Sequence, residues 1–324
     1  MGLEILKPGL LTTIQDTGRH GFQKEGIIVS GAMDTFALRV ANLLVGNAPH
    51  EAALEITLTG PSIRFTQDQL IALSGADLSP TINGESVAMW RPVHVKKDSI
   101  LEFKAPKAGC RSYLAVAGGL DLPQVMGSYA TFLRAFIGGF QGRALQAGDF
   151  IPCRTCDEQG IAQSFSSSNW TPDPQLYPNY QPNPCIRAIK GPEFELFSET
   201  SSTQIWSERF QVSMQSDRMG YCLQGVSLYL EEPTELISSA VTFGTVQVPP
   251  EGKPIILMAD HQTTGGYPRI LQVISADLPI LAQVVPGQTI SFEEVTLEEA
   301  QQLYIRQEQH LVQLARAVHL KKNA

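Results

Sequence analysis

Short alternating segments, each introduced by turn residues, recur along the chain of 324 residues and predict a mainly β protein. In residues 97–103, Lys-Asp-Ser precedes Ile-Leu-Glu-Phe, and the same order returns at 147–152 and 286–292. A turn followed by alternation with a period of two is typical of a half-buried strand. The chain also contains 27 glycines and 21 prolines, which supply many turns. We therefore expect short strands to dominate the fold.

Two segments depart from this pattern and predict helices. Asp34 is a good N-cap for an apolar face over 36–44, and Thr296 opens a capping box for a helix that extends to about Val318. The second helix is expected to bury the apolar residues between Ala300 and Leu314, Tyr304 among them. Both segments are expected to be peripheral packing helices.

The length and a compositional break predict two lobes. A single core rarely grows beyond about 250–300 residues, and a Ser-rich stretch at 164–169 is followed by five prolines up to residue 184. Such a stretch suits an extended connector. We predict an N-terminal β lobe over residues 1–155, a connector over 156–184, and a C-terminal β lobe over 185–324 that ends in a helix.

Charge and cysteine content narrow the setting in which the protein works. The net charge of −8 argues against nucleic acid, and no apolar run approaches the roughly 20 residues of a membrane span. The N-terminus lacks a signal-peptide pattern, and five cysteines, an odd number, indicate reduced thiols in the cytoplasm. Cys153-Arg-Thr-Cys156 stands without a second pair or a nearby His, so no metal site is expected.

Charged residues make up 17% of the chain, below the roughly 25% that is typical of soluble domains. We therefore expect a partner to cover an appreciable area of the surface. The chain has no phosphate-loop motif, no Gly-x-Ser-x-Gly elbow and no Met-Lys-Met site for biotin attachment. Nucleotide or biotin chemistry would thus depend on another chain.

Two polar, glycine-rich stretches are the candidates for chemistry. In residues 15–34, glycines permit turns with converging backbone amides, and the Arg19 guanidinium can donate two hydrogen bonds to an anion. The alternative is a structural turn in which Asp16 and Arg19 simply pair.

In residues 258–268, an acid, an imidazole, an amide and two hydroxyls precede Gly-Gly, a composition that is typical of a binding loop. The alternative is a wide hairpin whose hydroxyls cap backbone groups. An Asp-Arg-Gly order occurs at 16–21 and again at 217–220.

Four sequence blocks, in order over nearly the whole chain, resemble one family. They are Gln15-Asp-x-Gly-Arg-x-Gly21 with Ser30-Gly-Ala-Met-Asp34, Ala41-Asn-Leu-Leu-Val-Gly-Asn47 with Leu54-Glu55, Ser216-Asp-Arg-Met-Gly-Tyr221, and Gly244-x-x-Gln-Val-Pro-Pro-x-Gly-x-Pro254 with Asp260-x-Gln-Thr-x-Gly-Gly-Tyr-Pro268. This combination resembles the family of 5-oxoprolinase C subunits, whose members are also labelled biotin-dependent carboxyltransferases or the second component of allophanate hydrolase. The family is similar to the carboxyltransferase domain of urea amidolyase.

The resemblance implies two cyclophilin-like β-barrel lobes with a few peripheral helices. It also implies A-like and B-like partner subunits, and a complex that converts 5-oxo-L-proline to L-glutamate with ATP hydrolysis. One alternative is a carboxyltransferase that moves a carboxyl group from carboxybiotin to urea or a similar small amide. Another is a regulatory module that antagonises a kinase inhibitor similar to the B-like partner. The resemblance leaves open whether this chain also forms a homo-oligomer.

Both chemistries must disturb the resonance of an amide or lactam, which needs donors aimed at its oxygen and a group that moves a proton. The expected catalytic residues are Asp16, Arg19, Arg218, Asp260 and His261. The expected substrate-binding residues are Gln15, Gly18, Asp34, Asp217, Gln247, Gln262, Thr263, Gly265, Gly266 and Tyr267.

Overall fold

The computed structural model describes residues 1–155, 165–168 and 170–322, which pack into two compact units. Unit 1 contains Met1–His20, Ser30–Pro178 and the chain from Gln309 onward, and unit 2 contains Gly21–Val29 and Asn179–Glu308. Both units are discontinuous in sequence, unlike the linear division expected from the Ser/Pro break. The expected connector falls partly on residues 156–164 and 169, which lie outside the described residues.

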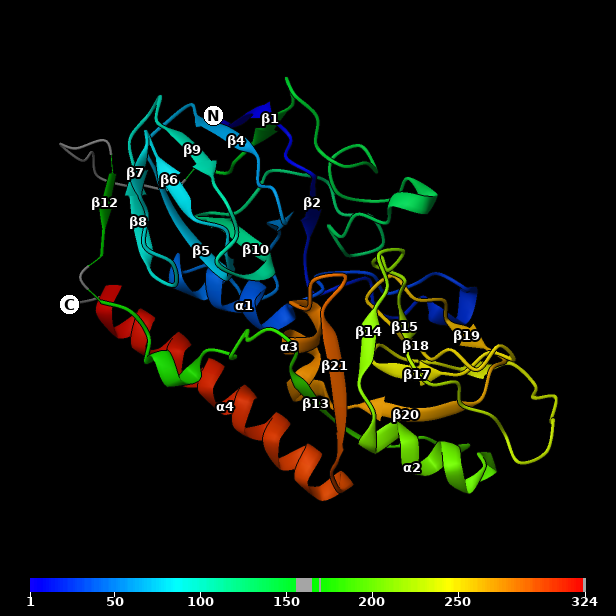
Figure 1. Ribbon diagram of the computed structural model, residues 1–324. Helices are drawn as coiled ribbons and strands as arrows, with labels where there is room; N and C mark the ends of the chain where they lie inside the picture. The colour runs from blue at the N-terminus through cyan, green and yellow to red at the C-terminus, as the bar shows by residue number, and fades with distance from the viewer. Residues whose placement is uncertain (156–164, 169, 323–324) are drawn as a thin grey trace. The chain divides into compact units, whose positions relative to one another are not determined.

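Unit 1 is built on two six-stranded sheets (Figure 1). The first has the order β11 (Phe150–Pro152), β1 (Gly2–Lys7), β4 (Ser62–Phe65), β9 (Ile100–Phe103), β6 (Pro80–Ile82) and β7 (Glu85–Ser86). The second has the order β12 (Phe165–Ser167), β8 (Pro92–Val95), β5 (Gln69–Asp77), β10 (Ala108–Val116), β3 (Ala53–Thr57) and β2 (Leu11–Gln15). Their pairings are antiparallel, as short connections allow.

The second sheet is buried on both faces, because successive side chains of a strand point to opposite sides. Along β5, Ile71 and Leu73 join the core that also takes in residues of the first sheet, such as Ile63. The intervening Leu70 and Ala72 pack instead in a second core, under α1 (Thr35–Leu44). The mainly β prediction is therefore confirmed, with strands that carry apolar residues on both faces rather than one.

Helix α1 begins and ends as predicted. The Asp34 carboxylate accepts a hydrogen bond from the Ala37 amide at 2.8 Å, which caps the N-terminus. At the other end, the amide of Gly46, which has a φ of 76°, donates to the Leu43 carbonyl. The buried face of the helix packs on β5 and β10, as Figure 1 shows.

Unit 2 contains a closed barrel, which confirms the expectation of a barrel for this part of the chain. Its strands follow the order β13 (Cys185–Lys190), β20 (Arg269–Val273), β17 (Thr245–Gln247), β18 (Ile255–Leu257), β15 (Gly220–Gln224), β14 (Phe210–Val212) and β21 (Thr289–Glu294). A parallel pairing of β13 with β21 closes the ring. Inside, the Phe210 and Phe292 rings are tilted by 54° at a centroid distance of 6.1 Å. A two-stranded ribbon joins β16 (Ser239–Ala240) to β19 (Thr264–Gly265).

Among the described residues, the remaining helices are α2 (Glu199–Ser207), α3 (Leu278–Ala282) and α4 (Leu297–Lys322). The predicted capping box of α4 is confirmed, since the Thr296 hydroxyl oxygen accepts from the Glu299 amide and the Glu299 carboxylate accepts from the Thr296 amide. The prediction that Tyr304 is buried in this helix is wrong, because its side chain is 45% exposed. None of the helices in the described parts of the chain combines the length and apolarity needed to cross a membrane.

The last part of α4 explains why unit 1 includes the end of the chain. Leu311, Leu314 and Val318 are buried in the same core as α1. The helix was expected to belong wholly to the C-terminal lobe, but its apolar residues past Gln309 pack with unit 1.

Candidate functional site

Asp16 and Arg19 in unit 1 hold the loop at residues 125–130 in place through hydrogen bonds. The Asp16 carboxylate accepts hydrogen bonds from the Gly18 amide and the Ser128 hydroxyl, both at 2.8 Å, and from the Tyr129 amide at 2.6 Å. Arg19 donates through Nε to the Val125 carbonyl at 3.0 Å and through Nη2 to the Ala130 carbonyl at 2.9 Å. Both side chains thus bind the main chain of residues 125–130.

Close packing in this cluster requires a glycine. Gly138 has a φ of 70°, and a Cβ built there would lie 2.1 Å from the Ala130 carbonyl oxygen and 2.8 Å from Arg19 Nη2. Only a residue without a Cβ lets the chain pass this closely. Arg19 itself is 1% exposed, and the Val125 and Ala130 carbonyls accept two of its hydrogen bonds.

The other expected residues of unit 1 also lie in structural hydrogen bonds. Gln15 is fully buried and donates through Nε2 to the Thr13 hydroxyl and the Thr131 carbonyl, both at 3.1 Å. Its Oε1 atom has no hydrogen-bond partner among the described residues. Asp34 is buried as the cap of α1. The roles of Gln15, Asp16, Gly18, Arg19 and Asp34 toward a substrate stay predictions.

A buried hydrogen-bond network fixes the chain at residues 33–34, directly before α1. The Glu55 carboxylate accepts from the Tyr113 hydroxyl at 2.7 Å and from the Met33 amide at 2.8 Å. The Tyr113 hydroxyl oxygen accepts from the Asp34 amide at 2.8 Å. Burial and the Glu55 charge raise the pKa of Tyr113 well above its ordinary value, which keeps the phenol protonated.

In unit 2, strand register brings Arg218 and Asp260 together. Gly220 of β15 pairs with Leu257 of β18, and the ladder continues when the Asp260 amide donates to the Arg218 carbonyl at 2.8 Å. The Arg218 side chain then donates through Nε and Nη2 to the two Asp260 carboxylate oxygens, each at 2.9 Å. This two-pronged ion pair is 7% and 5% exposed. The neighbouring Asp217 carboxylate closes the turn before β15 by accepting from the Met219 amide at 2.8 Å.

A hydrogen bond to the main chain fixes the tautomer of His261. It is 8% exposed, and its Nδ1 lies 2.5 Å from the Gln262 carbonyl oxygen. Because a carbonyl only accepts, Nδ1 carries the proton and Nε2 carries the lone pair. Burial lowers the pKa of His261 below its ordinary 6.5, so the ring is neutral near pH 7.

The residues that follow His261 fold into a packed loop. The Thr263 carbonyl accepts from the Val241 amide, and Thr264 and Gly265 pair with β16. Gly265 lies against the side chain of Gln247, where a Cβ would come within 2.5 Å of Nε2. That Nε2 atom donates to the Tyr267 carbonyl at 3.3 Å. The predicted residues 260–267 and Gln247 therefore form one local group in unit 2.

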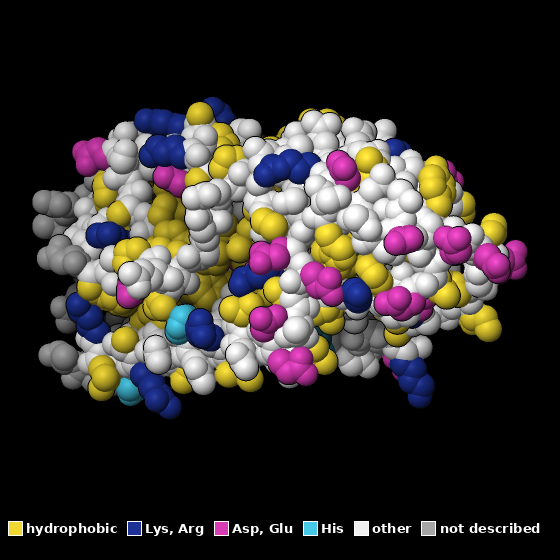
Figure 2. Space-filling view, turned by 60° about the horizontal axis from the view of Figure 1, so that its bottom comes forward, with side chains coloured by type: hydrophobic (Ala, Val, Ile, Leu, Met, Phe, Trp, Pro, Cys, Tyr) yellow, Lys and Arg dark blue, Asp and Glu magenta, His cyan; other side chains and the backbone are white. Residues whose placement is uncertain are grey.

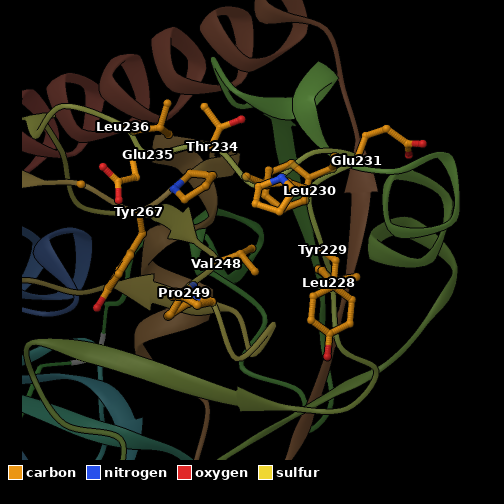
Figure 3. Close-up of a pocket in the computed structure, with 15 residues that line it drawn as sticks. Leu228, Tyr229, Leu230, Glu231, Thr234, Glu235, Leu236, Val248, Pro249 and Tyr267 are labelled. Atoms are coloured by element: carbon orange, nitrogen blue, oxygen red, sulfur yellow. The ribbon is translucent and has the colours of Figure 1, made fainter.

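This group borders a pocket of about 780 Å³, whose wall includes Gly266 and Tyr267 (Figure 3). The opposite walls come from residues 228–231 and 233–236, which no sequence motif marked, and from 248–250, which belong to the fourth sequence block. Most of the lining is apolar, and its charged members are Glu231 and Glu235. The volume is in the range of small-ligand and peptide-anchor pockets.

Comparison with known proteins reveals close relatives of this chain. The family model described as carboxyltransferase domain, subdomain A and B, matches residues 25–294. The 5-oxoprolinase C subunit of Escherichia coli (strain K12) is 43% identical over 98% of this chain and 99% of its own length. The same-named protein of Haemophilus influenzae is 42% identical over 98% of this chain and 99% of its own length.

The chain belongs to the carboxyltransferase domain family. The crystal structure of K. lactis urea amidolyase superimposes on 97% of this chain with a TM-score of 0.89 and 31% identity. This chain spans 20% of that longer protein.

For this member of the carboxyltransferase domain family, the pocket in unit 2 does not fit a nucleoside triphosphate. The residues that line it include no Lys, Arg or His, and two glutamates would repel phosphates. In the described parts of the chain, no group of three or more His, Cys, Asp and Glu side chains is placed to hold a metal ion. Burial raises the pKa of Cys153 to about 12, so it is a poor thiolate, and Cys156 lies outside the described residues.

Proposed function

We propose that this chain is the C subunit of an ATP-dependent 5-oxoprolinase complex, which converts 5-oxo-L-proline to L-glutamate with ATP hydrolysis. The observation that carries the proposal is the 43% identity to a relative of that name over nearly the full length of both chains. A-like and B-like partner subunits would complete the complex. ATP would be bound through them, because the pocket in unit 2 has no cation for a triphosphate.

In this proposal, the loop that follows β18 acts on the lactam. Opening the ring adds water across the C–N bond: the hydroxyl joins the carbonyl carbon and a proton joins the nitrogen. The neutral His261 Nε2 would accept the proton of the attacking water. The Gly266 amide donates to no described residue and would meet the lactam oxygen, where charge develops.

Arg218 and Asp260 would serve as positioning residues. Two side-chain hydrogen bonds and one backbone hydrogen bond fix Asp260, and His261 follows it directly in the chain. Movement of Asp260 would therefore shift the imidazole. In the same proposal, Tyr267 and Gln247 would shape the substrate side of the loop.

A carboxyltransferase that uses urea or a similar amide is a second candidate. The description of the family model and the fold match to K. lactis urea amidolyase favour it. Carboxybiotin would then come from a separate carrier protein.

Reconstitution with purified A-like and B-like partner proteins tests the two candidates. We expect glutamate from 5-oxoproline and ATP without biotin or bicarbonate. Carboxylation of urea that requires carboxybiotin, with no glutamate formed, would establish the second candidate instead.

The His261→Gln variant tests the proposed base within that assay. We expect kcat to fall by about 10²–10⁴-fold. Because the pKa of His261 is lowered, the wild-type complex should keep its activity as the pH falls past 6.5 and lose it only at lower pH. His50→Gln, at an exposed position of unit 1, is the matched control. Equal rates for both variants would remove His261 from the mechanism.

A further inference from the structure

The pocket beside Tyr267 has a mainly apolar lining that is rich in leucine and proline. Leu228, Leu230, Leu236 and Val248 line it together with prolines at 233, 249, 250 and 268. Each proline holds its own φ near −65°, which narrows the conformations open to the backbone around it. Figure 3 shows Tyr229 and Tyr267 at opposite ends of the pocket.

Apolar surface continues beyond the mouth of the pocket. Tyr229 and Tyr267 are 55% and 48% exposed, and Ile237, next to Leu236 in the chain, is 93% exposed. Leu196, next to Phe197 of the lining, is 41% exposed. A small ligand inside the pocket would leave these side chains in water, whereas a protein that binds across the mouth would cover them.

The charged residues that line the pocket are both acidic. Glu231 and Glu235 belong to the lining and Glu232 lies between them in the chain. None of the three makes an ion pair with a described residue. Figure 2 shows acidic side chains in magenta among hydrophobic ones toward the right edge of the view. An anion such as 5-oxoproline is repelled here, and Lys or Arg side chains are attracted.

The backbone of the rim is also open to a partner. Residues 228–231 are fixed, since the Leu228 amide donates to the Gly252 carbonyl and the Glu231 amide to the Leu196 carbonyl. By contrast, the backbone amides of Glu232 and of residues 234–238 donate to no described residue, and Pro233 between them has no amide hydrogen. A polypeptide main chain supplies the carbonyls that such a row of donors can bind.

We propose that this pocket is the docking site for an extended segment of a partner protein, with a large apolar side chain in the pocket flanked by Lys or Arg residues that face Glu231 and Glu235. The inference rests on the proposed function, which requires partner proteins. Docking would then take place next to the loop of His261, because Gly266 and Tyr267 belong both to the walls of the pocket and to that loop.

Charge reversal tests the docking site. The double variant E231K/E235K should weaken the binding of the A-like or B-like partner protein at least tenfold in calorimetric titrations at 0.1 M salt. E85K/E102K makes the same charge change at two exposed positions of unit 1, outside the pocket lining, and should bind like the wild type. Leu236→Ala, which keeps all charges, should also weaken binding. Thermal melts of each variant show that the fold is retained.

The outcomes separate the two proposals. If the wild-type complex forms and produces glutamate while E231K/E235K and Leu236→Ala bind normally, docking at the pocket is overturned and the proposed function stands. If the variants lose binding but the wild-type complex produces no glutamate, the docking site stands and the proposed function is overturned. If neither partner protein binds the wild type, the docking inference is overturned.

Discussion

In unit 1 and in unit 2, an aspartate and an arginine lie buried near glycines, but their hydrogen bonds go to different partners. Asp16 and Arg19 bind main-chain groups of residues 125–130, more than a hundred positions away in the chain. Arg218 and Asp260 bind each other through two side-chain hydrogen bonds. The same residue types therefore fasten a loop in one unit and form a charge pair in the other.

This difference sets how each cluster responds to substitution. A buried charge that loses its opposite charge is left uncompensated, which is expensive in a medium of low polarisability. A buried charge solvated by backbone carbonyls depends instead on the exact path of the chain around it. The pair in unit 2 is thus sensitive to charge, and the cluster in unit 1 is sensitive to shape.

The largest effect should come from removing one charge of the pair in unit 2. Asp260→Ala leaves the guanidinium of Arg218 without its carboxylate and should lower the free energy of unfolding by about 3–5 kcal/mol. Urea denaturation followed by tryptophan fluorescence measures the change. The double variant Arg218→Met/Asp260→Leu should recover much of the loss, because it removes both charges. A double variant less stable than Asp260→Ala would contradict this account.

A smaller effect should follow from a change of shape in unit 1. Gly138→Ala forces a residue with a Cβ to a φ of 70° and places that Cβ 2.1 Å from the Ala130 carbonyl oxygen. We expect a loss of about 3 kcal/mol, of which about 1–2 kcal/mol is the cost of the left-handed backbone. Gly148→Ala is the matched control, since Gly148 has a φ of 89° and nothing within 4 Å of its Cβ position. Equal losses of stability for the two variants would show that the chain is not tightly packed around Arg19.

The smallest effect should come from an ion pair of the same geometry that is partly exposed. Glu193 accepts from Arg269 through Nε at 2.7 Å and Nη2 at 2.5 Å, with side chains 15% and 21% exposed. Glu193→Gln should cost about 1 kcal/mol near pH 7, because water screens the pair. The hydrogen bond from Arg269 lowers the pKa of Glu193 below its ordinary 4.5.

The pH dependence of that loss follows from the lowered pKa. The stabilisation by Glu193 is present above pH 4.5 and disappears as the pH falls through the lowered value, since both states are then protonated. Unfolding curves of wild type and Glu193→Gln should therefore converge in acid. A stability difference that stays constant down to the most acidic pH tested would rule out the charge as its source.

Much of the fold follows from local patterns. Turns followed by alternation predicted strands within 97–103, 147–152 and 286–292, where β9, β11 and the first part of β21 lie, and the caps at Asp34 and Thr296 predicted where α1 and α4 begin. Helix α2 was not predicted, because its Ser- and Thr-rich sequence shows little apolar periodicity and buries few side chains. The grouping of the end of α4 with unit 1 depends on which core its apolar residues meet, and no local pattern encodes that.

Part of the candidate site could also be predicted from local sequence patterns. Residues 260–267 could be marked because their polar density is visible in a single stretch of sequence. The hydrogen bonds of Arg19 could not, because they go to backbone carbonyls of residues 125 and 130, and every residue type carries such a group. The pocket wall at 228–236 carries no motif and becomes a feature only when it folds against residues 248–250.

The parallel pairing of β13 with β21 also has a consequence for how the protein is made. These strands open and close the barrel, and about a hundred residues of chain separate them. During synthesis, β13 leaves the ribosome long before β20 and β21, its two neighbours in the barrel, have been made. Strand β13 must therefore wait with both edges unpaired, and contacts this distant in sequence form slowly. Newly made chains should depend on chaperones most strongly during that interval.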